Sequence, residues 1–190
     1  MLTISGGGGL DSTHGRLGAS AGGVGTVIVT GLTTDWQLTG DLVLGWQDGS
    51  EGYLEIRDSA SVTVFGVTRI GGWVADTFGR VEIEDATLIS DGEARIGMYS
   101  GSEGEVLVSD GGLWDVYDTL TVGSNGGLGS LTIEGGGDVD IQEDLIVGAH
   151  ASGAGSSSVT IDGAGSELIV GGNMIVADEG EAWFSVDDDG

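Results

Sequence analysis

The stretch GSLTIEGGGDVDIQEDLIVG, residues 129–148, holds two short runs in which apolar and polar residues alternate, separated by three glycines and closed by another glycine. Alternation with a period of two is typical of β-strands that bury one face. The same spacings return along the chain with different letters. An internal repeat is therefore the first fold to consider.

Two series of glycines measure the repeat. Members of the first series precede the first strand of each expected repeat: Gly25, Gly52, Gly79, Gly104, Gly129, Gly155 and Gly180. Members of the second series close the third strand: Gly18, Gly45, Gly71, Gly97, Gly123 and Gly148, with Ala177 next in line. Neighbouring members are 25 to 27 residues apart in both series, which predicts a repeat of about 26 residues.

Six apolar positions keep fixed offsets from these glycines. The first strand contributes Val27/Val29, Leu54/Ile56, Val81/Ile83, Val106/Val108, Leu131/Ile133 and Val159/Ile161. The second strand contributes Trp36/Leu38, Val62/Val64, Leu88/Ser90, Trp114/Val116, Val139/Ile141 and Leu168/Val170. The third strand contributes Leu42/Leu44, Thr68/Ile70, Ala94/Ile96, Leu120/Val122, Leu145/Val147 and Met174/Val176. One coil cannot bury such a face alone, but stacked coils form a continuous core.

These offsets predict an all-β fold, a parallel β-helix (β-solenoid) with three short strands per coil and roughly seven coils. Parallel strand connections favour a right-handed winding. We expect residues 1–190 to form a single solenoid domain, with residues 1–24 as a degenerate N-terminal coil and residues 180–190 as the start of a further coil. Turns are expected at the glycine or aspartate two residues after each first-strand pair, at Gly31, Asp58, Asp85, Asp110, Gly135 and Gly163.

The composition excludes several classes of protein. Five Arg or Lys residues against 31 Asp or Glu give a formal charge of -26, which repels nucleic acid and anionic membrane surfaces. The chain has no cysteine and therefore no disulfide or thiolate metal site. No run of residues is apolar enough to span a membrane. The start of the chain lacks the pattern of a signal peptide, so we expect export to depend on segments outside it.

Residues 129–180 resemble the strand repeat of bacterial autotransporter passengers and PEP-CTERM-associated surface proteins. The resemblance rests on the G-x-L-x-I run that starts at Gly129, the glycines that follow it and the L-x-V-G run that ends at Gly148. It implies a right-handed parallel β-helix exported to the bacterial surface or beyond. It implies no catalytic residues, because the repeated positions of that family are structural.

Stacking of coils would bring acidic residues into ladders, with Glu55 over Glu82 and with Asp58, Asp85 and Asp110 at one corner. Stacked carboxylates are potential calcium ligands. The nine-residue repeat of calcium-binding solenoids is absent, and the closest fragment is residues 135–140. We therefore expect a solvated acidic surface and no cofactor, with calcium as the alternative.

Paired carboxylates also hydrolyse glycosidic bonds, and the formal candidates are Asp115 with Asp140 and Glu55 with Glu82. Glycan-cleaving β-helices usually build a groove from long loops and basic residues, and this chain has short corners and few cations. We expect no enzyme activity. No catalytic, cofactor-binding or metal-binding residue is assigned.

Two further pairs stand out. Arg69 and Arg95 take the same outward position in adjacent coils, where we expect salt bridges to nearby carboxylates. Trp46 and Trp73 follow the closing glycines of successive coils; their indoles either stack on sugar rings or pack in the loops and between subunits, and packing is favoured. His14 and His150 occupy unrelated places in their coils and are expected in loops.

Together these observations predict a non-enzymatic structural or adhesive solenoid of the bacterial cell surface or extracellular matrix. Its expected partners are further copies of itself, joined head to tail into fibres, because the ends of a solenoid expose strand edges. The alternative is a fragment of an autotransporter passenger that binds surface glycans, or less readily cleaves them.

Overall fold

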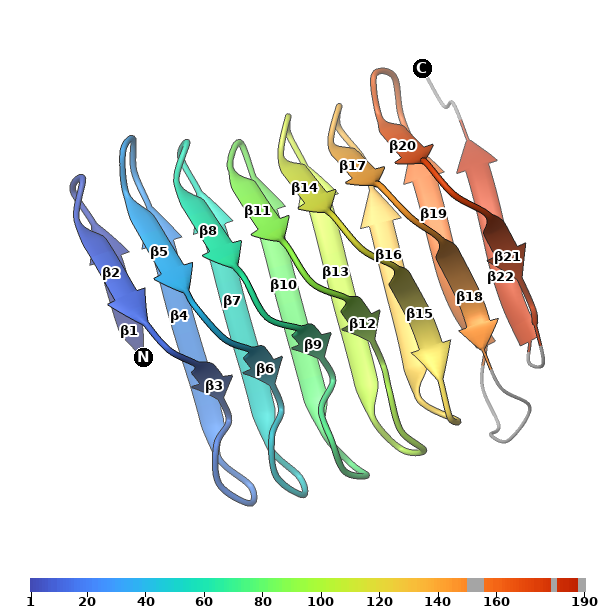
Figure 1. Ribbon diagram of the computed structural model, residues 1–190, viewed down its shortest axis with the longest axis horizontal. Helices are drawn as coiled ribbons and strands as arrows, with labels where there is room; N and C mark the ends of the chain where they lie inside the picture. Colours follow the sequence, from blue (N-terminus) through green and yellow to red (C-terminus); the bar gives the residue numbers. More distant parts are fainter. Residues whose placement is uncertain (150–155, 179–180, 188–190) are drawn as a thin grey trace.

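The computed structural model describes residues 1–149, 156–178 and 181–187. These residues form 22 strands and their connections, with no helix among them. The strands are stacked in chain order from one end of the molecule to the other (Figure 1). They belong to three parallel sheets of eight, seven and seven strands. The predicted β-solenoid is confirmed.

Each coil contributes one strand to each sheet. The first sheet contains β1 (Leu2–Ser5), β4 (Val24–Thr30), β7 (Glu51–Arg57), β10 (Phe78–Glu84), β13 (Glu103–Ser109), β16 (Leu128–Ile133), β19 (Ser156–Asp162) and β22 (Glu181–Asp187). The second contains β2 (Gly9–Ser12), β5 (Asp35–Leu38), β8 (Ser61–Val64), β11 (Thr87–Ser90), β14 (Leu113–Val116), β17 (Asp138–Ile141) and β20 (Glu167–Val170). The third contains β3 (Gly15–Leu17), β6 (Leu42–Leu44), β9 (Thr68–Ile70), β12 (Ala94–Ile96), β15 (Leu120–Ser124), β18 (Leu145–Ala149) and β21 (Met174–Val176).

The strands pair in the register that the apolar offsets predict. Val81, for example, lies between Leu54 and Val106 in the first sheet. The N-terminal segment forms a coil of its own through β1, β2 and β3, and β22 begins another coil after β21. Eight strands at a parallel spacing of about 4.8 Å give a stack roughly 35 Å long. A single chain is thus about as long as it is wide (Figure 1).

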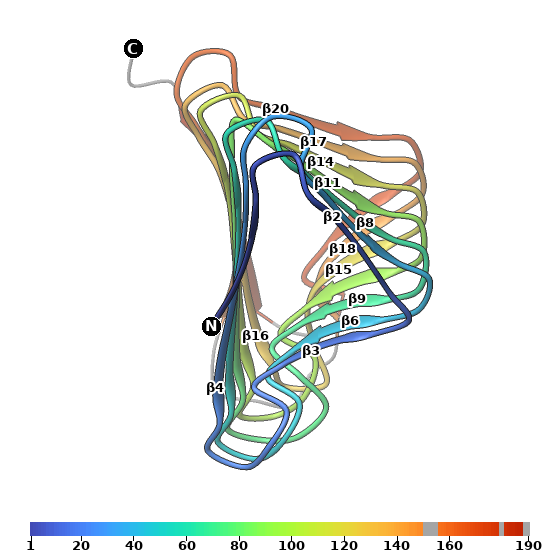
Figure 2. The same cartoon turned by 90° about the vertical axis from the view of Figure 1, so that its left-hand side faces the viewer.

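The winding is right-handed. Figure 2 views the solenoid from its N-terminal end, where the chain rises along β4, crosses to the second sheet and returns through the third sheet. This path is clockwise as the chain recedes from the viewer. It agrees with the handedness that parallel β-connections favour.

The inward side chains form a closed core between the three sheets. The two tryptophans predicted at inward positions, Trp36 and Trp114, are 4% and 0% exposed. Each indole donates a hydrogen bond to a serine of the preceding coil, Trp36 to Ser12 at 3.0 Å and Trp114 to Ser90 at 3.1 Å. Buried polar atoms are costly without partners, and these serines satisfy both rings.

The two glycine series are opposite sides of one corner. A Cβ atom on Gly52 would lie 2.8 Å from the backbone nitrogen of Gly45 and 2.7 Å from Cα of Leu44. The same contact joins the equivalent glycines of other coils: Gly25 with Gly18, Gly79 with Gly71, Gly104 with Gly97 and Gly129 with Gly123. In these five coils both sides are glycine, and the loop returns its two ends to backbone contact.

Gly155 and Gly180, the last two members of the first glycine series, lie outside the described residues. The position in line with Gly129 is occupied by Ser157 in β19 and by Ala182 in β22. The predicted inward pair Val159 and Ile161 still aligns with Leu131 and Ile133. A turn glycine is replaceable, whereas an apolar pair facing the core is not.

The predicted turn positions after the first sheet are confirmed. Every one has a positive φ: Gly31, Asp58, Asp85, Asp110, Gly135 and Gly163. Aspartate tolerates this left-handed backbone better than most residues other than glycine and asparagine. The recurrence of aspartate at this corner therefore follows from backbone conformation.

Substitution of Gly97 by alanine should destabilise the protein more than substitution of Gly111. Both glycines have a positive φ, but a Cβ on Gly97 would overlap the carbonyl oxygen of Leu128, whereas a Cβ on Gly111 meets nothing within 4 Å. We expect Gly111→Ala to cost about 1 kcal/mol for the left-handed backbone and Gly97→Ala about 3 kcal/mol or more. Chemical denaturation of both variants measures the difference. Equal losses would show that the corner does not require the close contact.

Candidate functional site

The most distinctive surface is a band of aromatic and arginine side chains beside the third sheet. We define this aromatic–arginine band by Arg16, Trp46, Arg69, Trp73, Arg95 and Tyr99. The arginines take the outward position of β3, β9 and β12. The aromatic residues follow the closing glycines of β6, β9 and β12, where the chain leaves the sheet. In-register stacking therefore places these side chains on neighbouring coils.

The rings of the band contact one another and the arginines. Trp46 and Trp73 lie 6.2 Å apart between ring centroids at 72°, an edge-on contact, and Trp73 and Tyr99 stack at 6.2 Å and 27°. The guanidinium of Arg16 lies 4.2 Å from the ring centroid of Trp46, and that of Arg69 lies 4.5 Å from the centroid of Trp73. Each of these cation–π contacts contributes about 0.5–1 kcal/mol at an exposed site.

Arg69 connects the band to the third sheet through an ion pair. Its side chain is 11% exposed and forms an ion pair with Asp41, with 2.8 Å between Nη1 and Oδ2. The amide of Val67 also donates to Asp41 at 3.0 Å. Partial burial alone would raise the pKa of Asp41, but these hydrogen bonds and the charge of Arg69 lower the pKa below its ordinary value. Arg69 is thus held between a carboxylate and an indole.

The predicted salt bridges of the arginine pair are confirmed. Arg69 and Arg95 are direct neighbours in the third sheet, and Arg95 pairs with Glu93 on its own coil. Trp46 and Trp73 are also neighbours, as predicted. A face of each indole is covered by an arginine, so the arrangement matches packing in the loops better than an open platform for sugar rings. The arginine cover was not evident from the sequence because it joins residues of different coils.

The acidic ladders are in place, and their charges are partly paired. Glu55 lies beside Glu82, and Arg57 lies beside Glu84. Arg57 approaches Glu55 at 3.5 Å, and these half-exposed side chains form a weak surface pair. Within the described residues no group of three or more His, Cys, Asp and Glu side chains could hold a metal ion.

The aspartates at the turns bond to hydroxyl groups of neighbouring coils. Thr30 donates to Asp58 at 2.5 Å, and Ser59 donates to Asp85 at 3.4 Å. The carboxylates thus have partners along the stack, next to the positive-φ backbone that explains their positions.

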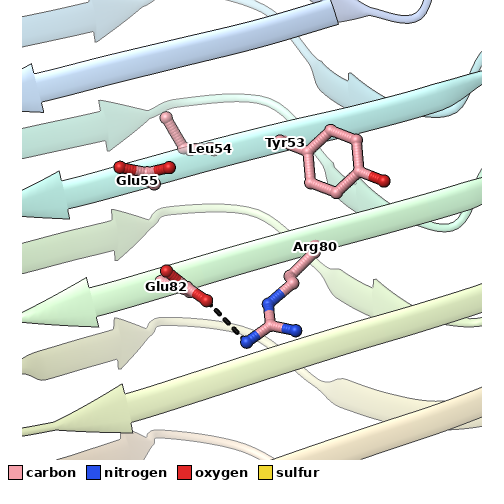
Figure 3. Close-up of a pocket in the computed structure, with 5 residues that line it drawn as sticks. All are labelled: Tyr53, Leu54, Glu55, Arg80 and Glu82. Atoms are coloured by element: carbon pink, nitrogen blue, oxygen red, sulfur yellow. Dashed lines mark ion pairs between the residues drawn. The ribbon is translucent and has the colours of Figure 1, made fainter. Parts of the chain in front are cut away.

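Arg80 sits between two shallow depressions on the outer face of the first sheet. One, of about 290 Å³, is lined by Tyr53, Leu54, Glu55, Arg80 and Glu82, which project from β7 and β10 (Figure 3). The other, of about 330 Å³, lies on the far side of Arg80, toward Glu105. Arg80 pairs with Glu82 at 2.5 Å and with Glu105 at 3.3 Å. Its charge is therefore already neutralised by the lining carboxylates.

The second candidate carboxylate pair lies on the second sheet. Asp115 and Asp140 are direct neighbours on β14 and β17. The pKa of Asp115 is raised above its ordinary value, mainly by partial burial and secondarily by the negative charge of Asp140. Gln142 donates to Asp140 at 3.3 Å. Side by side on one sheet face, the two groups repel each other, and neither forms an ion pair with a described residue.

Of the two histidines, His14 lies in the connection between β2 and β3, as predicted, and its Nδ1 accepts a hydrogen bond of 3.0 Å from the amide of Asp41. His150 lies outside the described residues. His14 thus caps a turn of the adjacent coil.

Comparison with known proteins gives no relative: no family model, no curated protein and no solved structure matches the chain. In the part of the chain that the structure describes, no helix has the length and apolar character needed to cross a bilayer.

Replacement of Asp115 by asparagine should stabilise the protein at neutral pH. The folded state binds the proton of Asp115 more tightly than the unfolded chain, so its ionised form costs stability above the raised pKa, and this cost fades as the pH falls through it. We expect a gain of about 0.5 kcal/mol at pH 7 that shrinks on acidification. Thermal unfolding at several pH values measures it. Asp11→Asn, in the same outward column beside the uncharged Gln37, is the control and should change stability at pH 7 by less than about 0.5 kcal/mol.

Replacement of Trp73 by alanine should destabilise the protein because it uncovers Arg69 and removes two ring contacts. We expect a loss of about 1–2 kcal/mol in chemical denaturation. Tyr117→Ala removes another half-exposed aromatic ring, 51% exposed on a different turn, and should change stability by less than about 0.5 kcal/mol. A neutral Trp73→Ala would mean that the band is not held by packing.

Proposed function

We propose that this chain is a non-enzymatic structural and adhesive β-solenoid that works at the bacterial cell surface or in the extracellular matrix. The observation that carries the proposal is the unbroken register of three parallel sheets around one continuous core. Every internal coil is hydrogen-bonded to both neighbours, so the stack resists bending and unfolding locally. Such a fold presents repeated side chains on a stiff support.

The proposal that the chain is not an enzyme is supported by the ion pairs and the positions of the candidate carboxylates. Glu82 is neutralised by Arg80, and Glu55 is approached by Arg57. Asp115 and Asp140 stand next to each other on one sheet instead of facing each other across a cleft. Glycosidases hold their two carboxyl groups on opposite sides of the scissile bond.

The proposed location rests on composition and resemblance. A net charge of -26 and the lack of cysteine suit a secreted, soluble surface, and residues 129–180 resemble the repeat of exported bacterial passengers. The solenoid stacks along one axis (Figure 1), and strand edges at the ends of such a stack can pair with another copy. Head-to-tail assembly is therefore part of the proposal.

Glycan binding is the second candidate function, and the observation in its favour is the aromatic–arginine band. Trp73 is 40% exposed, and Trp46 and Tyr99 are partly exposed. A sugar would have to contact these exposed parts of the rings or displace an arginine. Binding on a glycan array that is lost when Trp46 and Trp73 are both changed to alanine, in folded protein, would favour this function over a purely structural one.

Electron microscopy of the purified chain, with calcium and with a chelator, tests the structural proposal. In salt that screens the net charge, we expect linear assemblies under both conditions, because the strand edges at the ends need no metal. Assemblies only with calcium would make the acidic ladders the assembling element. Folded single particles that depolymerise a polysaccharide would overturn the proposal, and the Asp115→Asn and Glu82→Gln variants would then locate the activity.

A further inference from the structure

The two ends of the solenoid differ in how far the core side chains are exposed to solvent. At the C-terminal end, the inward and neighbouring apolar side chains of the last strands are open to solvent. The most exposed are Ile169 at 47%, Met174 at 44%, Val176 at 39%, Trp183 at 69% and Val186 at 66%. Leu168, Val170 and Phe184 are partly buried. An exposed apolar face bordered by free strand edges is a surface for strand addition.

At the N-terminal end, most of the core is covered, but the first sheet is incompletely covered. Ile4 and Leu17 are 8% and 4% exposed, whereas Leu2, in line with the inward Val27, is 46% exposed. Gly15 leaves room that Leu38 and Leu42 fill, since a Cβ there would lie 2.8 Å from each of them. The terminal strand β1 pairs with only four of the seven residues of β4, from Val27 to Thr30.

The uncovered part of β4 is therefore an open edge. Val24, at its start, is 66% exposed. In contrast, β22 has seven residues and pairs along its full length with β19. The strand at one end is thus long enough to cover all of β4, and the strand at the other end is not.

The strand counts determine how two copies can meet. The first sheet has eight strands and the other two have seven. If a second copy stacked β1 on β22, its β2 and β3 would lie two strand spacings, about 9.6 Å, from β20 and β21, and neither sheet would continue. If β22 instead takes the place of β1, all three sheets continue without a gap.

We propose that two copies of this chain join head to tail by strand exchange, with β22 of one copy replacing β1 of the next on β4. The proposal rests on the self-assembly proposed above and names the surface that performs it. In this junction β20 pairs with β2 of the second copy, and β21 pairs with β3. The displaced segment is the four-residue strand β1, and the strand that replaces it has seven residues.

The columns of the solenoid fix which residues meet. Continuing them across the junction buries apolar residues on apolar or small ones: Phe184 on Val27, Val186 on Val29, Leu168 on Leu10, Val170 on Ser12, Met174 on Gly15 and Val176 on Leu17. Outward residues pair as Trp183 with Thr26, Ser185 with Ile28, Ile169 with Asp11 and Ile175 with Arg16. No carboxylate meets a carboxylate in these columns, although each copy carries a charge of -26.

The exchange gains more pairing than it loses. It breaks the four-residue pairing of β1 with β4 and uncovers Ile4. It forms a seven-residue pairing on β4, pairs the free edges of β20 and β21, and covers the open C-terminal core. Buried apolar area is the main favourable term in association. The net result favours the assembled chain once salt screens the long-range repulsion.

Engineered disulfides test the junction, since the natural chain has no cysteine. In the exchanged junction Ser185 lies beside Ile28 of the next copy, whereas plain stacking would place it beside Thr3. The variants Ile28→Cys/Ser185→Cys and Thr3→Cys/Ser185→Cys therefore form a matched pair that shares one cysteine. Within one chain β4 and β22 are six strand spacings apart, about 29 Å, so neither pair can close a disulfide inside a folded chain.

After mild oxidation in high salt, we expect the Ile28/Ser185 variant to form a ladder of covalent dimers and longer chains on non-reducing gels. Its cross-linked fraction should exceed that of the Thr3/Ser185 variant by roughly tenfold, because disulfides need Cα atoms within about 7 Å. Preferential cross-linking of Thr3/Ser185 would overturn the exchange and leave head-to-tail assembly intact. Assemblies that give no ladder with either variant would overturn the proposed junction, and so would folded protein that stays as single particles. The structural proposal itself would be overturned only if those single particles were also catalytically active.

Discussion

The contact between two glycine backbones at the corner from the third sheet to the first is the constraint on which the rest of the solenoid depends. At Gly45 and Gly52, and at the equivalent pairs, no side chain fits between the two ends of the loop. In these five coils the loop therefore returns the chain to the first sheet at a fixed point, and the apolar pair two residues later faces the core. At β19 and β22 the corner position holds Ser157 and Ala182, and the core-facing residues keep the register there. The corner and the core thus act together to set the spacing of the repeat.

Because the coils stack in register, equivalent outward residues of successive coils lie in one column. In an acidic chain this places like charges side by side, and their repulsion lowers stability. Like charges on neighbouring strands lie directly beside each other, as Glu55 and Glu82 do. The few arginines are placed where they relieve this repulsion: Arg80 bridges Glu82 and Glu105, and Arg69 neutralises Asp41. Asp115 and Asp140 form no ion pair within the described residues, and partial burial together with the charge of Asp140 raises the pKa of Asp115.

The sequence predicted the fold because its signal is local and repeated. The offsets of Val81 and Ile83 from Gly79 are enough to assign strand, face and register, and neighbouring coils repeat them. The glycine spacing alone does not give the register of β19 and β22, where Ser157 and Ala182 lie in line with Gly129. Prediction from the sequence also missed the cover of Trp46 by Arg16, since contacts between outward side chains depend on rotamers and loop paths that spacing does not encode.

Function in a repetitive fold is most specific where the repetition stops. Within the stack, each side chain has equivalent residues of the neighbouring coils on both sides. Successive positions along a sheet therefore offer a ligand similar surroundings. At each end of the described stack, one neighbouring coil is missing, and the core side chains there are either covered locally or exposed. Gly15 allows such local cover, because its missing side chain leaves room for Leu38 and Leu42 of the next coil. No equivalent protects Met174, Val176 and Val186. The two ends of the described solenoid therefore differ, and the head-to-tail contact proposed above joins two different surfaces, a geometry that builds open linear chains instead of closed dimers.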